Sequence, residues 1–234
     1  SDGQNICTAV QLCVCAPRRW SWLTACSFPW TSCVQAYFLR YPNPQSSHVV
    51  SVDVLDRRIE QRPPRGGEDD NAPFFVLCTS RLMLKRGSLP AWAPKNIIKN
   101  TESWVLEDSE VDLSPADSRA PRVMSIWTRN LDHTTALAIT EGLRYTERYS
   151  DDGSMPAAIT QSDTRADIRS DLPFSLLRGR IEKFGMKRYI SHIDSSRNGL
   201  IWSIHQLMPS IVRKTELPAL EESVKNTRRH RLLH

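Results

Sequence analysis

The sequence lacks a continuous apolar run of the length that a membrane-spanning helix requires. One stretch, residues 20–39, carries no charged side chain. Serine, threonine, glutamine and proline interrupt it, however, whereas a spanning helix needs about 20 mostly apolar residues. The 234 residues, with 40% hydrophobic and 24% charged side chains, have the composition of a folded globular protein. The sequence therefore argues against a transmembrane helix and against a chain that is disordered throughout.

The sequence also lacks the short motifs that accompany common catalytic sites. It contains no G-x-S-x-G elbow, no P-loop, no G-x-G-x-x-G loop and no H-E-x-x-H pair. The six histidines are scattered, and His48 and His133 lie at the ends of predicted strands. A lone histidine at such a place is more often a hydrogen-bonded structural residue than a base or a metal ligand. We therefore predict no catalytic residue, and we do not expect an enzyme.

The cysteines are concentrated near the N-terminus. Five of the six occur in the first 33 residues, and Cys78 stands alone. There is one Cys-x-Cys and no Cys-x-x-Cys, and no histidine precedes His48, so the spacing fits no zinc site. We predict no metal site. Buried thiols are favoured, and a disulfide between two of these cysteines is the alternative.

Basic residues exceed acidic ones by 31 to 26, which gives a net charge of +5 and a pI of about 9.0. This excess suits an acidic surface or a phosphate and does not single out nucleic acid. One basic set stands out near the C-terminus: Arg178, Arg180, Lys183, Lys187 and Arg188. We expect an exposed helix face there. Any member that points into a cavity must meet an anion, because an unpaired buried charge is very unfavourable.

Hydrophobic periodicity predicts two helices separated by a series of strands. The first helix follows Pro29, with apolar residues at Trp30, Val34, Tyr37 and Phe38. Strand-like patterns then recur at residues 48–59 (expected to be half-buried), 74–86, 102–113, 122–131, 134–149 and 157–170. In the third strand, alternation places Glu102, Asp108, Glu110 and Asp112 on one face, expected to be solvated. The period becomes helical again from residue 172, and Pro209 ends this helix.

The predicted fold class is α+β: a curved antiparallel sheet of about six to seven strands with a short N-terminal helix and a long C-terminal helix. The long helix can cover one face of the sheet, and a sheet that curls around a helix can enclose a cavity. The periodicity does not tell whether side chains or a ligand fill that cavity. Residues 28–208 form the predicted domain, between an atypical cysteine-rich segment (residues 1–27) and a basic tail (residues 209–234).

Several motifs within this domain resemble one known family. They are YFLRYPNP (residues 37–44), HVVSVDV (48–54), TSRLMLKRG (79–87), LPAWA (89–93), ESWVLEDS (102–109) and TRNLDH (128–133). In this order they resemble the PRELI-like (PRELI/Ups-type) mitochondrial phospholipid-transfer proteins, over about residues 28–208. Residues 1–26 look unlike the family, which usually begins with a short strand almost directly before position 28.

The resemblance implies a protein of the mitochondrial intermembrane space that carries one phospholipid between the outer and inner membranes. The family fold surrounds a lipid cavity with a lid loop at its mouth, and a small helical protein with twin Cys-x-nine-Cys motifs is its partner. The lipid is cargo, and no cofactor is implied. The Trp92-Ala93 lid and the strand with Thr128, Asn130 and His133 resemble the phosphatidic acid branch. The implied partners are thus phosphatidic acid, an anionic membrane surface and the helical protein, without nucleic acid.

The resemblance also implies site residues. The positions that match the headgroup and entrance residues of the family are Arg40, His48, Arg81, Lys85, Arg188 and His192. The positions that match its lid and membrane contact are Leu89, Pro90, Trp92 and Ala93. This chain departs from the family at His192, where Asn is common, and at Ser195, where Lys is common. For Arg40 and Arg81, an ion pair with acidic residues of the sheet is the alternative.

Two other functions stay open at this point. An interaction module of the same fold without transfer activity is compatible with Ser195 and with the atypical N-terminus. A hydrolase on a similar cavity would need an acid–base or nucleophile pair, and the sequence displays none. A lipid-transfer assay separates the three, because an enzyme changes the lipid, a carrier moves it intact and an inactive module does neither.

Overall fold

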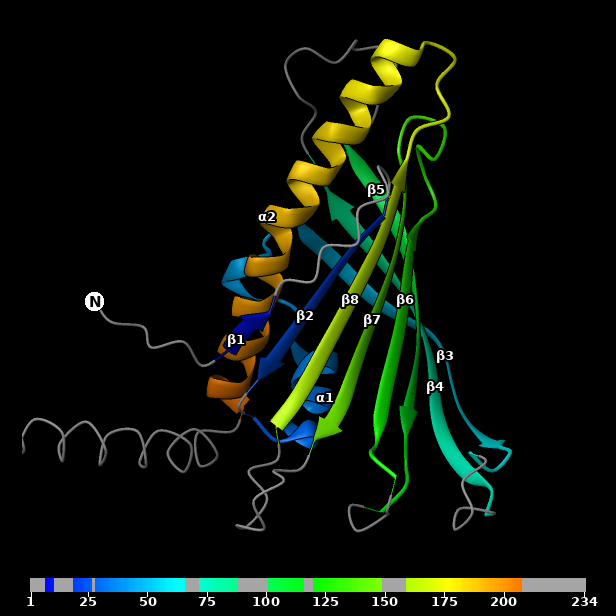
Figure 1. Ribbon diagram of the computed structural model, residues 1–234, viewed down its shortest axis with the longest axis vertical. Helices are drawn as coiled ribbons and strands as arrows, with labels where there is room; N and C mark the ends of the chain where they lie inside the picture. Colours follow the sequence, from blue (N-terminus) through cyan, green and yellow to red (C-terminus); the bar gives the residue numbers. More distant parts are fainter. Residues whose placement is uncertain are drawn as a thin grey trace, which may run out of the picture.

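The computed structural model describes residues 7–10, 19–26, 28–65, 72–87, 101–115, 120–148 and 159–207. Within them, eight strands form one antiparallel sheet in the order β1-β2-β8-β7-β6-β5-β4-β3 (Figure 1). The strands are β1 (Cys7–Val10), β2 (Arg19–Cys26), β3 (Val49–Arg62), β4 (Phe74–Arg86), β5 (Glu102–Asp112), β6 (Val123–Asn130), β7 (Ala138–Arg148) and β8 (Ile159–Arg169). The helices are α1 (Trp30–Leu39), a short 3-10 turn η1 (Pro44–Ser46) and α2 (Ser175–Leu207). No helix in these ranges combines the length and apolarity needed to cross a lipid bilayer.

This architecture confirms the predicted α+β fold. The six predicted strands are β3 to β8, and each lies beside its neighbour in sequence. β2 precedes α1 and pairs with β8, so the short first strand expected from the family resemblance is present in a segment that the motifs left unmatched. β1 pairs with β2 at the edge of the sheet.

Two predicted boundaries are wrong for local reasons. The strand expected at residues 134–149 begins at Ala138, because a turn precedes it. In this turn the backbone N–H groups of Ala136 and Leu137 both donate to the carbonyl of His133 at 2.9 Å, and His133 has a φ of 60°. The long helix begins at Ser175 and not at residue 172, because Pro173 disfavours helical backbone in the residue before it.

The prediction that β3 is half-buried is wrong for most of the strand. Val49 is buried, but Val50, Val54 and Ile59 are 46%, 53% and 64% exposed. β3 is the last strand of the sheet and pairs with β4 alone. Both helices pack closest to β7 and β8, so they leave the β3 edge largely uncovered.

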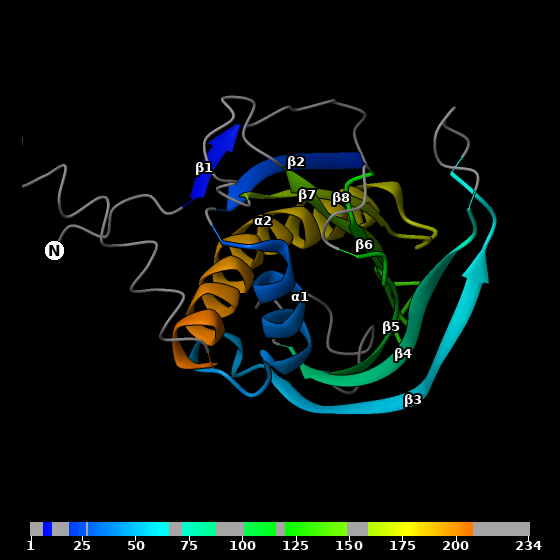
Figure 2. The ribbon, with the colours of Figure 1, turned by 90° about the horizontal axis from the view of Figure 1, so that it is seen from below.

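The hydrophobic core lies between α1, the C-terminal half of α2 and the inner face of the sheet. Its buried members include Phe28, Trp30, Val34, Tyr37, Val111, Met124, Ile126, Tyr145, Leu200 and Ile204. The helical members recur at every third or fourth position and therefore share one face of their helix. Figure 2 shows the sheet curling around both helices. The core fills the end of this curl that contains α1, and the N-terminal half of α2 crosses the other end.

Candidate functional site

A cavity of about 360 Å³ lies between α2 and the inner face of the curved sheet. Alternate residues of β5, β6 and β7 and one face of α2 point into it, as the strand and helix periods require. Its apolar walls are formed by Met83, Val105, Ile126, Ala136, Leu137, Ile139, Leu143, Ile181, Phe184 and Ile193. Gly185 permits close contact of α2 with the sheet, because a Cβ there would lie 3.0 Å from a methyl carbon of Leu137 and 3.2 Å from Ile168. The cavity is thus mostly apolar.

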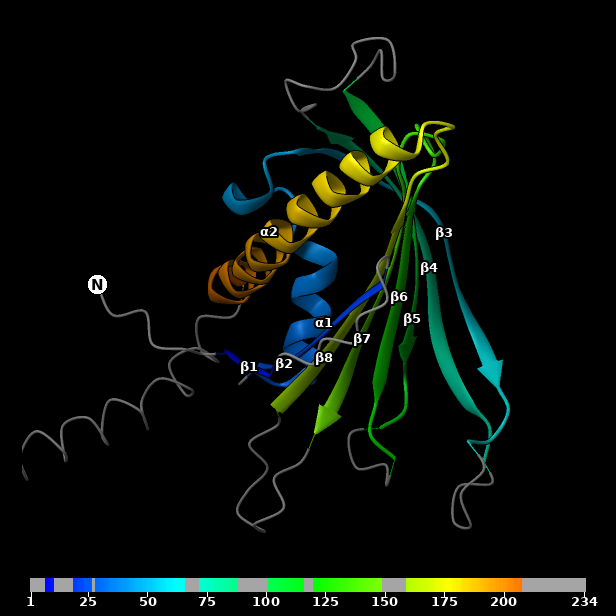
Figure 3. The same ribbon diagram turned by 45° about the horizontal axis from the view of Figure 1, so that its top comes forward.

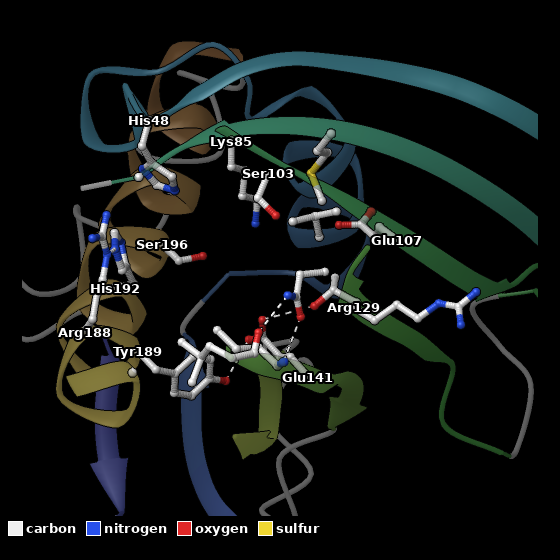
Figure 4. A pocket seen from close by; sticks show the side chains of 18 of the residues that line it. His48, Lys85, Ser103, Glu107, Arg129, Glu141, Arg188, Tyr189, His192 and Ser196 are labelled. Carbon is white, nitrogen blue, oxygen red and sulfur yellow. Dashed lines mark hydrogen bonds between the residues drawn. The ribbon is translucent and has the colours of Figure 1, made fainter. Parts of the chain in front are cut away.

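Four basic side chains gather on one side of this cavity (Figure 4). His48 precedes β3, Lys85 lies near the end of β4, and Arg188 and His192 lie one turn apart on α2. The ring centroids of the two histidines are 4.8 Å apart, and Arg188 Nε donates a hydrogen bond of 3.3 Å to His192 Nε2. No acidic side chain in the described ranges forms an ion pair with Lys85. We call these four residues the basic cluster.

The histidines of the basic cluster are held in the neutral form. Burial lowers the pKa of His48 to about 4, and the positive charges of His192, Lys85 and Arg188 act in the same direction. Burial, together with Arg188 and Lys85, also lowers the pKa of His192. In both histidines the neighbouring positive charges add to the effect of burial. An anion bound here would relieve the repulsion and allow the histidines to take up protons.

A buried polar network lies deeper in the fold, beside α1. The carboxylate of Glu107 is fully buried and accepts hydrogen bonds of 2.8 Å from Tyr37 Oη and from Arg81 Nε. Arg40 lies 4.0 Å from the same carboxylate and donates to Ser196 Oγ at 3.2 Å. Burial and the nearby Glu107 raise the pKa of Tyr37, so its hydroxyl remains a donor. Two guanidinium groups therefore share one carboxylate, which leaves the network with an excess positive charge.

Five of the six expected headgroup residues line the cavity, and one does not. Arg40, His48, Lys85, Arg188 and His192 all line the cavity, and the Nε atom of Arg40 is buried without a hydrogen-bond partner in the described ranges. Arg81 does not line it, and its guanidinium is directed to Glu107 and to the carbonyl of Phe38 at 3.3 Å. The alternative ion pair therefore describes the contacts of Arg81. The expected lid residues Leu89, Pro90, Trp92 and Ala93 lie outside the described ranges.

The remaining charged patterns have mixed outcomes. Of the basic set on α2, Arg188 faces the cavity and Arg178 is half-buried, whereas Arg180, Lys183 and Lys187 are exposed as expected. The expectation that Asp112 belongs to a solvated face is wrong, because Asp112 is buried and forms an ion pair with Arg65. Alternation could not foresee a partner from the loop that follows β3.

Sequence reasoning missed a second polar group in the cavity wall. Glu141 accepts hydrogen bonds from Tyr189 Oη at 2.9 Å and from Thr128 Oγ1 at 3.4 Å (Figure 4). Burial and Glu141 raise the pKa of Tyr189. Thr128 lies directly between Glu107 and Glu141 on three neighbouring strands. The register of β5, β6 and β7 is needed to see this arrangement, which joins α2 to the sheet across the cavity.

The motif Thr-x-Asn-x-x-His shapes the turn at the cavity rim. Asn130 Nδ2 donates to the carbonyls of Asp132 and Leu137 at 2.7 and 2.9 Å, and its Oδ1 accepts from the N–H of Ile139 at 2.8 Å. The ring of His133 lies 3.3 Å from the carbonyl of Glu102. These contacts hold the turn between β6 and β7 against the start of β5.

Comparison with known proteins identifies the family. The sequence model of the PRELI-like family matches residues 31–210. The chain belongs to the PRELI-like family. It is 35% identical over 177 residues to "Protein ups1 homolog" of Schizosaccharomyces pombe, which covers 76% of this chain and 89% of that protein. It is 32% identical over 173 residues to "Protein UPS1, mitochondrial" of Saccharomyces cerevisiae, with 74% and 85% covered.

A vertebrate relative is more distant. "PRELI domain-containing protein 1, mitochondrial" of Homo sapiens is 26% identical over 198 residues, which cover 83% of this chain and 78% of that protein. The names of these relatives confirm the mitochondrial location predicted from the motifs. The family is that of the mitochondrial lipid-transfer proteins, as the motifs indicate.

Proposed function

We propose that this PRELI-like protein carries phosphatidic acid between the outer and inner mitochondrial membranes through the intermembrane space, without catalysing a reaction. The observation that carries the proposal is the basic cluster of His48, Lys85, Arg188 and His192 at one side of an apolar cavity. The apolar walls suit acyl chains and the cluster suits a phosphate. An anionic phospholipid combines both parts in one molecule.

The apolar walls lower the main free-energy cost of moving a lipid through water. At about 0.8 kcal/mol per buried CH₂, exposing two acyl chains costs on the order of 20 kcal/mol. A carrier therefore has to replace the membrane interior with apolar side chains. The cavity walls supplied by β5, β6, β7 and α2 have that character.

The charge of the cluster supports phosphatidic acid over other phospholipids. A phosphate monoester carries about −1.5 to −2 near neutral pH, whereas a phosphodiester carries one negative charge. Lys85 and Arg188 offer two fixed positive charges, and Arg188 adds a guanidinium fork where the family commonly has Lys. The neutral histidines can add charge when the anion arrives. Ser195 lies where a further Lys is common, so the preference is expected to be weaker than in a relative with that Lys.

The polar groups of the cavity do not resemble a hydrolytic site. Among the described residues that line it, no serine hydroxyl hydrogen-bonds to a histidine. The carboxylate of Glu107 is engaged by Tyr37 and Arg81, and that of Glu141 by Tyr189 and Thr128. This supports a carrier over an enzyme.

We also propose that a small helical protein with twin Cys-x-nine-Cys motifs stabilises the chain, as in the family. Large apolar side chains are exposed on the inner face of the sheet edge and at the end of α1: Leu39, Val54, Ile59 and Phe75. Arg57 lies over the ring of Phe38 at 5.8 Å, so β3 and the end of α1 are close in space. Such a patch is typical of a surface that a partner covers.

The deciding experiment is lipid transfer between vesicles with the purified protein and partner. Donor vesicles contain fluorescent phosphatidic acid, phosphatidylserine or phosphatidylethanolamine, and mass spectrometry determines whether the transferred lipid is intact. We expect intact phosphatidic acid to move fastest. A chemically altered lipid would identify an enzyme. No transfer of any of the three lipids would favour an interaction module.

A further inference from the structure

The beginning of α2 exposes two large apolar side chains to solvent. Phe174 is 70% exposed and Leu176 is 86% exposed, the two highest values among the large hydrophobic residues of the described ranges. Phe174 already accepts the first hydrogen bond of the helix, from the N–H of Arg178 at 2.9 Å. Both residues therefore lie at the first turn of the helix.

Basic residues continue the exposed face of α2 that begins at Leu176. Arg180, Lys183 and Lys187 follow Leu176 at intervals of four, three and four residues, and all three are exposed. Residues so spaced share one face of an α-helix. Ile181, Gly185 and Arg188, which line the cavity, lie on the other side of α2. One side of the helix thus forms a wall of the binding site, and the other presents Leu176 and the basic groups outward.

Glu182 is the only Asp or Glu between Asp171 and Asp194. Its carboxylate accepts a hydrogen bond of 3.0 Å from the backbone N–H of Ser170, at the end of β8. The exposed stripe is therefore basic, and the N-terminal end of the helix dipole adds to its positive potential.

This end of α2 lies at the rim of the cavity. The N–H of Asp171 donates to the carbonyl of Thr135 at 2.9 Å, and the following residues, Ala136 and Leu137, line the cavity. Figures 1 and 3 show the start of α2 at the same end of the sheet as the turn between β6 and β7 and the start of β5. A membrane that contacts this end of the molecule would therefore lie close to the cavity rim.

We propose that Phe174, Leu176, Arg180, Lys183 and Lys187 form a docking surface for an anionic phospholipid bilayer. Phe174 and Leu176 enter the interfacial region, where apolar side chains leave water, and the three basic residues contact the lipid phosphates. An anionic bilayer is the occupant that matches both parts of the surface, since a membrane is apolar just below its charged headgroups. The inference rests on the proposed function in one respect, because a lipid carrier must bring the rim of its cavity to a membrane.

The test measures binding of the full chain with its partner to vesicles by sedimentation. Vesicles of phosphatidylcholine alone are compared with vesicles that also contain phosphatidylglycerol, which is anionic but is not the proposed cargo. F174S/L176S should weaken binding to the anionic vesicles at least tenfold. K183Q/K187Q should weaken it by about fivefold for each charge and reduce its dependence on salt.

The matched control is W127S, which removes an exposed apolar side chain from β6 that belongs neither to the α2 surface nor to the proposed partner patch. It should leave vesicle binding unchanged. Unchanged binding of F174S/L176S, or an equal loss in the control, would overturn the proposal. Loss of partner binding by F174S/L176S, with normal vesicle binding, would also overturn it, because the surface would then dock a protein.

Titration with a soluble short-chain phosphatidic acid separates this proposal from the proposed function. F174S/L176S should bind it with the affinity of the unmodified protein, because neither side chain lines the cavity. A variant that loses both vesicle binding and the soluble lipid would contradict a docking role. If the unmodified protein bound vesicles through α2 but did not bind the soluble lipid, the proposed function would fail while the docking surface stood.

Discussion

The imidazole rings of His48 and His192 lie 4.8 Å apart in the wall of the cavity, tilted at 52° to each other. One precedes the edge strand β3 and the other lies in the middle of α2, so the contact depends on the sheet curling around the helix. His192 stands where the family commonly has Asn. We therefore expect the pair to give this chain a pH dependence that an Asn would not.

The first prediction concerns stability and pH. The pKa of His48 is lowered from 6.5 to about 4, and that of His192 is lowered as well. The unfolded chain then binds more protons than the folded one as pH falls through this window, so the empty protein loses stability between about pH 6.5 and 4. Thermal unfolding across this range measures the loss.

The variants H48Q and H192N should each reduce this pH dependence, and H133Q serves as the control because His133 is not in the basic cluster. A soluble phosphatidic acid should also reduce it, since the anion restores the pKa values of the histidines. A slope that is the same in H48Q/H192N and in the unmodified protein would contradict the assignment.

The second prediction concerns Arg188. R188E should abolish binding of soluble phosphatidic acid, because it places a negative charge beside Lys85 and His192. R188K should retain most of the binding, since Lys is common at this position in the family. Calorimetric titration measures both. R144E, a charge reversal at an exposed position of β7, should bind normally. Normal binding by R188E would show that Arg188 does not contact the cargo.

The third prediction concerns the buried network around Glu107. E107Q removes the one carboxylate that balances Arg81 and Arg40 and should destabilise the protein by about 3–5 kcal/mol. Y37F removes a single hydrogen bond to the same carboxylate and should cost about 1–2 kcal/mol. Urea denaturation gives both values. A smaller loss for E107Q than for Y37F would contradict this account of the network.

The fourth prediction concerns Trp92, in the segment that resembles the family lid. Two prolines flank it without a helical or strand period, and tryptophan favours the membrane interface. W92A should weaken binding to anionic vesicles and slow transfer, with a melting temperature close to that of the unmodified protein. A large fall in the melting temperature would instead identify Trp92 as a core residue.

The fifth prediction concerns the helical partner. The chain expressed alone should aggregate, because Leu39, Ile59 and Phe75 expose apolar surface near the sheet edge. Co-expression with the twin Cys-x-nine-Cys protein should raise the soluble yield and the lifetime of the chain. Equal yield and lifetime with and without the partner would argue against this dependence.

The sequence by itself determined the local elements of this protein. The apolar spacing of Trp30, Val34 and Tyr37 predicts α1, and the strand at Phe74–Arg86 has the bounds that its pattern predicts. Both elements depend on residues that are close in the sequence, and the hydrophobic periodicity reflects their spacing directly. The ordered motifs, from residues 37–44 to 128–133, were sufficient to indicate the family, and the family model matches residues 31–210, which contain all of them.

The family resemblance implied site residues, but only the tertiary structure shows which of them share the cavity. His48, Lys85 and Arg188 come from three distant segments, and the curl of the sheet around α2 brings them together. The same curl directs Arg81 to Glu107 and leaves β3 exposed at the edge. Strand order and curvature arise from the packing of the whole sheet against both helices. The repeat periods of strands and helices in the sequence do not specify strand order or sheet curvature.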